Sequence, residues 1–202
     1  MMPPYQREPA LEPSFKNTID RLPEILLRNA PSMMKRMVAT IQQAIAQDGQ
    51  LANASYSALL LKVSEPDLVR EFEVAMKKLV IAIKRDASQP ALSTAGLSLS
   101  LEPLEAVAAV SETDFLTSTE QFGALSARAK TLGVTGVNAY KKDLFVTALK
   151  NAFAQAHIDG HEVTKLMPYA LRALNTELVN IYGKLNAVQR DAATAPQETS
   201  AC

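Results

Sequence analysis

Apolar and polar residues alternate along most of the chain with the three-to-four-residue spacing of amphipathic helices. The pattern is clearest in residues 140–188, where two periodic segments flank a break at 157–161 with the sequence His-Ile-Asp-Gly-His. The first segment predicts a helix over 141–156, and the second predicts a helix from about 161 to 188. Asp-Gly is typical of a turn between helices because Gly readily adopts the left-handed conformation that ends one. We therefore expect an antiparallel helix pair here.

The N-terminal half also has helical periodicity, interrupted by prolines. A helix is expected to begin near Ser14, and Pro23 either kinks it or begins a second short helix. A cleaner helix is predicted over 31–47, followed by a short apolar helix over 56–63. The sequence Ser-Glu-Pro-Asp then opens the helix predicted over 64–86, because it offers an N-cap serine and a proline in the first turn.

The middle of the chain is less regular. Residues 87–96 form a linker of mostly small residues with one proline, and the alternation that follows has the period of a strand. No second strand is expected to pair with it, so we expect an extended segment lying over the helices, whose open edge could pair with another chain. A long helix from about 100 to 132 is predicted next, interrupted near 111–114. The alternating apolar residues are Leu97, Leu99 and Leu101.

These elements predict an all-α fold, a single helical bundle of about six to eight helices over residues 14–190. The linker divides it into an N-terminal half, 14–86, and a C-terminal half, 97–190. Each half is small for an independent domain, so we favour one bundle, although the sequence leaves open whether the halves share one core. Residues 1–13 and 191–202 lack periodicity and are expected to be disordered tails.

Composition and charge argue against several classes of protein. Lys and Arg together number 21, as do Asp and Glu, which argues against a dedicated duplex nucleic-acid binder because phosphate binding needs a basic excess. The longest apolar run, Leu79 to Ile83, has five residues, far short of the roughly 18 of a membrane span. The single cysteine, Cys202, excludes an internal disulfide, and the N-terminus lacks a signal-peptide core. We expect a cytoplasmic protein.

Metal-type ligands cluster at one place, His157, Asp159, His161 and Glu162. Gly160 lies between the histidines where the helix is expected to break, so the pair has no reason to share a helix face, and capping and turn formation explain these residues better than a metal. The chain contains no Gly-X-Ser-X-Gly elbow and no Walker motif. We therefore expect no enzyme, no cofactor and no metal site.

Two groups of residues are candidates for binding. The first is apolar: the methionines of the 31–47 helix, which form either gap-filling core or an adaptable partner-binding groove, and the leucines of 97–101. The second is basic and could hold phosphates or an acidic partner, although a solvated helix face is the simpler interpretation. The apolar candidates are Met33, Met34, Met37, Leu97, Leu99 and Leu101, and the basic candidates are Lys77, Lys78, Lys84, Arg85, Lys141 and Lys142.

From Leu97 onward the order of features resembles the C-terminal region of a large bacterial family, domain of unknown function 1631. The match rests on a Leu-Ser-Leu segment before an acidic helix start, a helix with Ala-Leu, Arg and Leu, an Ile-Asp turn, and a final helix with Tyr, Leu and Asn. The chain has Val-Asn-Ala-Tyr at 137–140 where the family has Asn-Pro-Leu-Gly. The resemblance implies a bacterial origin and a helical scaffold, and it transfers no catalytic residue. The matching residues are Leu97, Ser98, Leu99, Glu102, Glu105, Ala124, Leu125, Arg128, Leu132, Ile158, Asp159, Tyr182, Leu185 and Asn186.

The favoured function is therefore a non-catalytic, cytoplasmic interaction or regulatory module that presents a helical surface to another protein or to a second copy of itself. A ligand-binding regulator is the alternative, for example one that binds a nucleotide second messenger through converging basic side chains. Direct nucleic-acid binding through the same side chains is a third hypothesis, which predicts a steep loss of affinity with salt.

Overall fold

The computed structural model describes residues 18–48, 53–88, 115–131 and 137–187. Every regular element in these ranges is helical, which confirms the predicted all-α class. The named elements of these ranges are five α-helices and one short 3-10 helix, and residues 18–20 are helical as well, so the helix count is slightly below the six to eight expected. They are α2 (Leu22–Gln47), α3 (Ala54–Ser88), α4 (Leu116–Thr131), η2 (Val137–Tyr140), α5 (Lys142–Gln155) and α6 (Gly160–Ala187).

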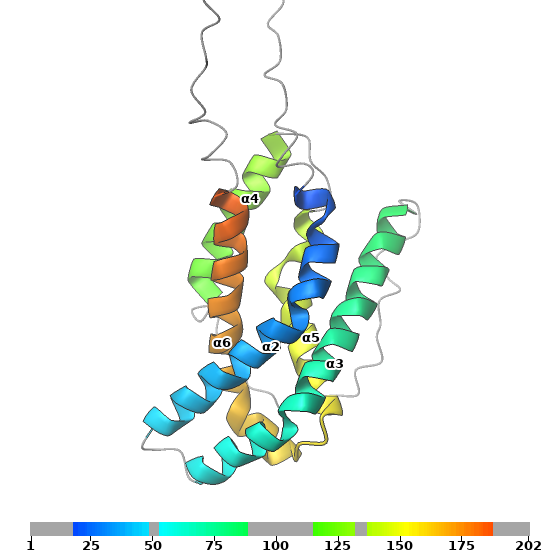
Figure 1. Cartoon of the computed structure of the whole chain (residues 1–202). Helices are drawn as coiled ribbons and strands as arrows, with labels where there is room; N and C mark the ends of the chain where they lie inside the picture. The colour runs from blue at the N-terminus through cyan, green and yellow to red at the C-terminus, as the bar shows by residue number, and fades with distance from the viewer. Residues whose placement is uncertain (1–17, 49–52, 89–114, 132–136, 188–202) are drawn as a thin grey trace, which may run out of the picture.

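The helices pack around one core to which both halves of the chain contribute. Helix α2 packs against both α3 and α6, α3 packs against α5, and α4 packs against α6 (Figure 1). Buried apolar residues from all five α-helices form one cluster, which runs from Ile19 to Leu185 along the sequence. The described parts of residues 14–86 and 97–190 therefore share one hydrophobic core, a point that the sequence left open.

Helices α2 and α3 each continue through a proline at which the sequence predicted a new helix. Pro31 lies inside α2, and Pro66 lies inside α3, so the predicted separate helices over 56–63 and 64–86 are one helix. Proline removes one backbone hydrogen bond and bends the helix, and both ribbons change direction along their length (Figure 1). Buried apolar residues continue on both sides of each proline, and this burial outweighs the lost hydrogen bond. Pro23 instead lies in the first turn of α2, where its missing N–H costs nothing.

The predicted break at 157–161 is confirmed. His157 has a φ of 56°, a left-handed conformation that ends α5. Asp159 then caps α6: its Oδ1 accepts a hydrogen bond from the His161 N–H at 2.9 Å, and its carbonyl accepts one from the Val163 N–H at 2.9 Å. Helix α5 packs more extensively against α3 than against α6, so the predicted α5–α6 pair does not form a unit by itself.

Several predicted features lie outside the described residues. These are the tails 1–13 and 191–202, the linker beyond Ser88, and the segment from 97 to 114 with its three leucines. None of the described helices combines the length and the apolar character of a membrane span.

Candidate functional site

The three methionines of α2 are core residues. Met34 and Met37 have no exposed surface, and Met33 is 3% exposed. They lie in the cluster that joins α2 to its neighbours, where the unbranched, flexible thioether fills irregular gaps. Of the two interpretations, this burial supports gap-filling core over a partner-binding face, because a partner cannot contact side chains that the bundle itself covers.

The described basic residues have local surroundings typical of solvated helix faces. Lys77 forms an ion pair with Glu73 one turn earlier on α3, and the Lys142 ammonium lies 5.6 Å from the centre of the Phe115 ring. Lys78 and Lys141 are exposed. The side chains of the two remaining candidates, Lys84 and Arg85, lie outside the described residues.

A groove of about 490 Å³ lies between α2 and α6. The two helices run antiparallel, so the N-terminal end of α2 faces the C-terminal end of α6 (Figure 1). Six of the twelve lining residues are large and apolar, and the other six are polar or charged. The lining residues are Thr18, Leu22, Ile25, Leu26, Asn29, Met33 and Arg36 on the α2 side and Glu177, Asn180, Ile181, Lys184 and Leu185 on α6.

An ion pair joins the two helices at one end of this groove. Arg36 donates two parallel hydrogen bonds to Glu177, from Nε to Oε1 at 2.9 Å and from Nη2 to Oε2 at 2.6 Å. The Glu177 side chain is 9% exposed, whereas that of Arg36 is 57% exposed. The hydrogen bonds to Glu177 raise the pKa of Arg36 above its usual range. The guanidinium of Arg36 thus compensates the negative charge of the Glu177 carboxylate inside the groove.

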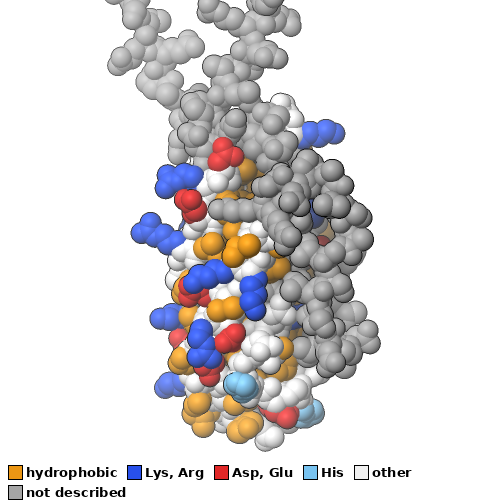
Figure 2. All heavy atoms as spheres, turned by 90° about the vertical axis from the view of Figure 1, so that its right-hand side faces the viewer, with side chains coloured by type: hydrophobic (Ala, Val, Ile, Leu, Met, Phe, Trp, Pro, Cys, Tyr) orange, Lys and Arg blue, Asp and Glu red, His pale blue; other side chains and the backbone are white. Residues whose placement is uncertain are grey.

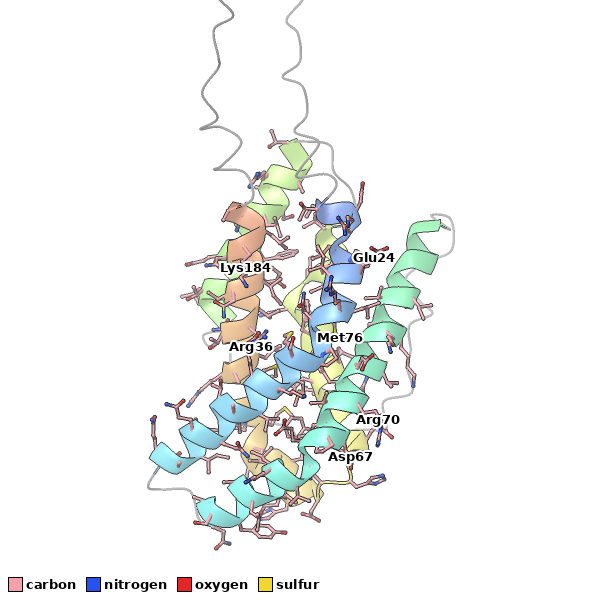
Figure 3. All side chains as sticks on the ribbon, in the orientation of Figure 1. Glu24, Arg36, Asp67, Arg70, Met76 and Lys184 are labelled. Atoms are coloured by element: carbon pink, nitrogen blue, oxygen red, sulfur yellow. The ribbon has the colours of Figure 1, made fainter. Side chains whose placement is uncertain are left out.

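A second cation of the groove, Lys184, lies two helical turns further along α6 and is exposed. It lies seven positions after Glu177 on α6, a distance of about 10 Å along the helix axis. Figure 3 labels Lys184 nearer the C-terminal end of α6 and Arg36 further down the bundle. The groove therefore has a neutralised ion pair at one end and a single lysine towards the other.

A second surface feature is a row of exposed apolar side chains on α3, which we call the outer stripe: Tyr56, Leu59 and Val63. Their exposed fractions are 56%, 60% and 70%. The i, i+3 and i+7 spacing places them on one face of the helix, opposite the buried Leu61 and Leu68. Hydrophobic side chains are visible at the surface on the side of the molecule that carries α3 (Figure 2).

The sequence contains a signal for the outer stripe. Between 56 and 63 apolar residues occur on both sides of the expected helix, which exceeds the single stripe that one core requires. The groove has no such local signal, since its lining combines residues about 150 positions apart.

Two buried polar side chains elsewhere, Glu162 and Tyr182, are engaged in contacts between elements. Glu162 accepts hydrogen bonds from Ser57 Oγ at 2.9 Å and from Lys165 Nζ at 2.7 Å, and the bond from Lys165 lowers its pKa. The Tyr182 hydroxyl donates to the Tyr140 carbonyl at 2.8 Å, and burial raises its pKa. These contacts join α6 to α3 and to η2, so these polar groups stabilise the packing of the elements.

The predicted turn residues are also accounted for by capping. His157, Asp159 and His161 are exposed, and Glu162 belongs to the contact with Lys165. Within the described ranges, no group of three or more His, Cys, Asp or Glu residues is arranged to hold a metal ion.

Comparison with protein-family models, curated proteins and solved structures found no match for this chain. The resemblance of residues 97–190 to domain of unknown function 1631 therefore stays a prediction.

Proposed function

We propose that this chain is a non-catalytic, cytoplasmic helical module that binds another protein through the outer stripe of α3. The observation that carries the proposal is the exposure of three large apolar side chains, Tyr56, Leu59 and Val63, at 56%, 60% and 70%. Single exposed apolar residues are common on protein surfaces, but a contiguous patch of a few hundred Å² marks an interaction site on many monomers.

The geometry of the stripe suits a helix or an apolar groove on the partner. Anchors at i, i+3 and i+7 are the positions that an amphipathic helix uses when it lies in a groove. Tyr56 adds an aromatic ring with a hydroxyl, the type of side chain enriched at the energetic centres of interfaces. Beyond the stripe, Arg70 is exposed and ion-paired with Asp67, so charged residues border the apolar patch on its C-terminal side (Figure 3).

The size of the stripe favours another protein over a second copy of this chain. A stable interface buries about 800 Å² on each partner, and three exposed side chains supply well under that area. A homodimer formed through the stripe would place the same small patch on both sides. A different partner with a concave groove can cover these three side chains more completely than a second convex stripe can.

The non-catalytic part of the proposal is supported by the buried titratable groups. The carboxylates of Glu162 and Glu177 are each held by a basic side chain, and the Tyr182 hydroxyl is bonded to a backbone carbonyl. Shifted pKa values mark catalytic sites when the shifted group faces a cleft without a structural partner. Here the lowered pKa of Glu162 and the raised pKa of Tyr182 have structural causes.

Site-specific photo-crosslinking in the host cell tests the proposal. A photoreactive amino acid is placed at Leu59, and in a matched strain at Thr176, which is exposed on α6. We expect one defined crosslinked protein from position 59 and none from position 176, with the band lost in the Val63→Asp background. Equal crosslinking from both positions, or none from either, would refute a binding role for the stripe.

Light scattering coupled to size exclusion gives the second arm of this test. We expect a monomer, because the stripe is too small for stable self-association. A stable dimer that Leu59→Asp converts to monomer would replace the hetero-partner with a second copy of this chain.

A further inference from the structure

We propose that the outer stripe is part of a wider contact surface, at one end of the bundle, for a protein whose own contact surface is apolar and uncharged. The inference rests on the proposed function, because it concerns the same site and states the chemistry of the partner. We call this wider surface the charge-poor end. It comprises the outer stripe and the exposed residues of the described parts of 43–60 and 154–168.

Hydrogen bonds between three helices show that these segments meet at one end of the bundle. Gln42 of α2 donates to a backbone carbonyl of α3 at 3.3 Å, and Ser57 of α3 donates to Glu162 of α6 at 2.9 Å. The Tyr169 hydroxyl of α6 donates to the Asp48 carboxylate, which directly follows α2. The end of α2, the start of α3 and the start of α6 are thus all joined, and the turn between α5 and α6 lies at the same end (Figure 1).

Charged residues are scarce in the segments that form this end. Residues 37–61 include one charged residue, whereas the chain average of 21% would give about five in that length. The next part of α3, residues 62–78, has eight charged residues. Figure 2 shows hydrophobic and histidine side chains at the end of the molecule drawn lowest, with the visible Lys and Arg side chains higher. Depletion of charge together with exposed aromatic and apolar side chains is typical of the core of an interface.

Each of the four charged residues of 37–61 and 151–171 has a partner within the molecule. Asp48 accepts the hydrogen bond from the Tyr169 hydroxyl, and Asp159 caps α6 by accepting a backbone N–H at 2.9 Å. Glu162 accepts a hydrogen bond from Lys165 at 2.7 Å. A partner that covers this end therefore displaces water mainly from apolar, hydroxyl and amide groups, and it avoids the large cost of burying an unpaired charge.

This distribution of charge selects among possible occupants. Nucleic acids and anionic lipid surfaces bind mainly through Lys and Arg, and an acidic peptide needs the same side chains. Within 37–61 and 151–171 the sequence has one such residue, Lys165, and Glu162 already pairs with it. An apolar protein surface needs no cation, and Tyr56 supplies the aromatic ring that is enriched in such interfaces.

The dimensions of the charge-poor end suit a protein interface. Helices are about 10 Å wide and pack about 8–10 Å apart, so three neighbouring helix ends span about 30 Å. A circular patch of about 800 Å², the share of each partner in a standard interface, has a diameter of about 32 Å. The flanking surface therefore supplies area that the outer stripe alone lacks. A concave partner also covers the convex stripe more completely than a second copy can.

Photo-crosslinking of the full chain in the host cell tests the extent of the interface. The photoreactive amino acid is placed at Gln47 on α2 or at Gln155 on α5, both exposed, and compared with Leu59 and the control Thr176. We expect Gln47 and Gln155 to give the same crosslinked protein as Leu59, and Thr176 to give none. A band from Leu59 alone would overturn this inference and leave the proposed function intact. No band from any of the positions would refute the proposed function as well.

Matched substitutions test whether the partner requires an uncharged surface. Gln47→Lys and Gln155→Lys each add one charge and are expected to reduce crosslinking from Leu59 about fivefold, because that charge must be desolvated. The uncharged variants Gln47→Met and Gln155→Met, of similar length, should keep it, as should Thr176→Lys outside the interface. Unchanged crosslinking in both lysine variants would overturn the inference. Circular dichroism confirms that each variant is folded.

The salt dependence of binding gives an independent readout. The crosslinked protein, once identified, is titrated with the full chain at about 50 and 500 mM NaCl, and we expect the Kd to change less than about twofold because uncharged contacts are not screened. Weakening of about tenfold or more at high salt would show charge-driven association and overturn the inference. A crosslinked band that contains only this chain would also overturn it, and would make the charge-poor end an interface between two copies.

Discussion

Removing Arg36 is expected to destabilise the bundle more than removing its partner. The side chains of this ion pair differ in burial, because Glu177 is 9% exposed and Arg36 is 57% exposed. In Arg36→Ala a largely buried carboxylate loses both of its hydrogen bonds, at 2.6 and 2.9 Å. In Glu177→Gln the arginine stays at the surface, where water replaces the lost interaction.

The magnitude follows from these contacts. A hydrogen bond to a charged group contributes about 1.5–3 kcal/mol when buried, and leaving a buried acceptor without a donor costs about 1–3 kcal/mol. Solvent screening at the exposed arginine reduces these values. We therefore expect Arg36→Ala to lower the free energy of unfolding by about 2 kcal/mol and Glu177→Gln by about 1 kcal/mol. For a chain of this length, 2 kcal/mol corresponds to a fall in Tm of about 4–8 °C.

Urea denaturation followed by circular dichroism measures both effects. The double variant Arg36→Ala/Glu177→Gln completes a cycle, in which we expect a coupling energy of about 1 kcal/mol. Arg70→Ala is the control, since Arg70 forms only exposed ion pairs with Asp67 and Glu71, and its midpoint should not change (Figure 3). Equal destabilisation by Arg36→Ala and Arg70→Ala, or a coupling energy near zero, would refute the argument from burial.

Three further predictions concern other buried contacts. The hydrogen bond from Lys165 lowers the pKa of Glu162 below 4.5. The stability that this carboxylate contributes is therefore present above pH 4.5 and is lost as the pH falls through the folded pKa. The difference in unfolding free energy between wild type and Glu162→Gln, measured by urea titration, should shrink as the pH falls from 4.5 through the folded pKa. Tyr182→Phe removes the 2.8 Å hydrogen bond to the Tyr140 carbonyl and should lower the unfolding free energy by about 1–2 kcal/mol, measured by denaturation at pH 7. Met34→Ala leaves a cavity at a site with no exposed surface and should cost about 2–5 kcal/mol by the same assay, an outcome that a loss below 1 kcal/mol would contradict.

Helix periodicity predicted faces more reliably than it predicted boundaries. The buried face of α5 agrees with its apolar spacing at Phe145, Ala148, Leu149, Ala152 and Phe153, of which none has exposed surface. The boundaries at prolines were wrong, because a proline is a local signal for a new helix, whereas continued burial on both sides keeps α2 and α3 intact.

Among the candidate sites too, features with a local sequence signal were predictable, whereas features that depend on tertiary packing were not. The outer stripe has a local signal, since Tyr56, Leu59 and Val63 make the segment apolar on more than one side. The methionines had the right chemistry for an adaptable surface, but their burial depends on which helices cover them. The basic candidates were chosen by charge alone, and the contacts of Lys77 and Lys142 depend on neighbours that charge does not reveal.

By itself, the sequence determined the helical class, the apolar faces and the turn at Asp159, because spacing and capping act over a few residues. Only the tertiary structure decided which faces meet. The pairing of Arg36 with Glu177 joins residues 141 positions apart, and the groove beside them exists because α2 and α6 pack antiparallel. Long-range packing of this kind depends on how all the apolar faces share one core, and no local pattern contains that information.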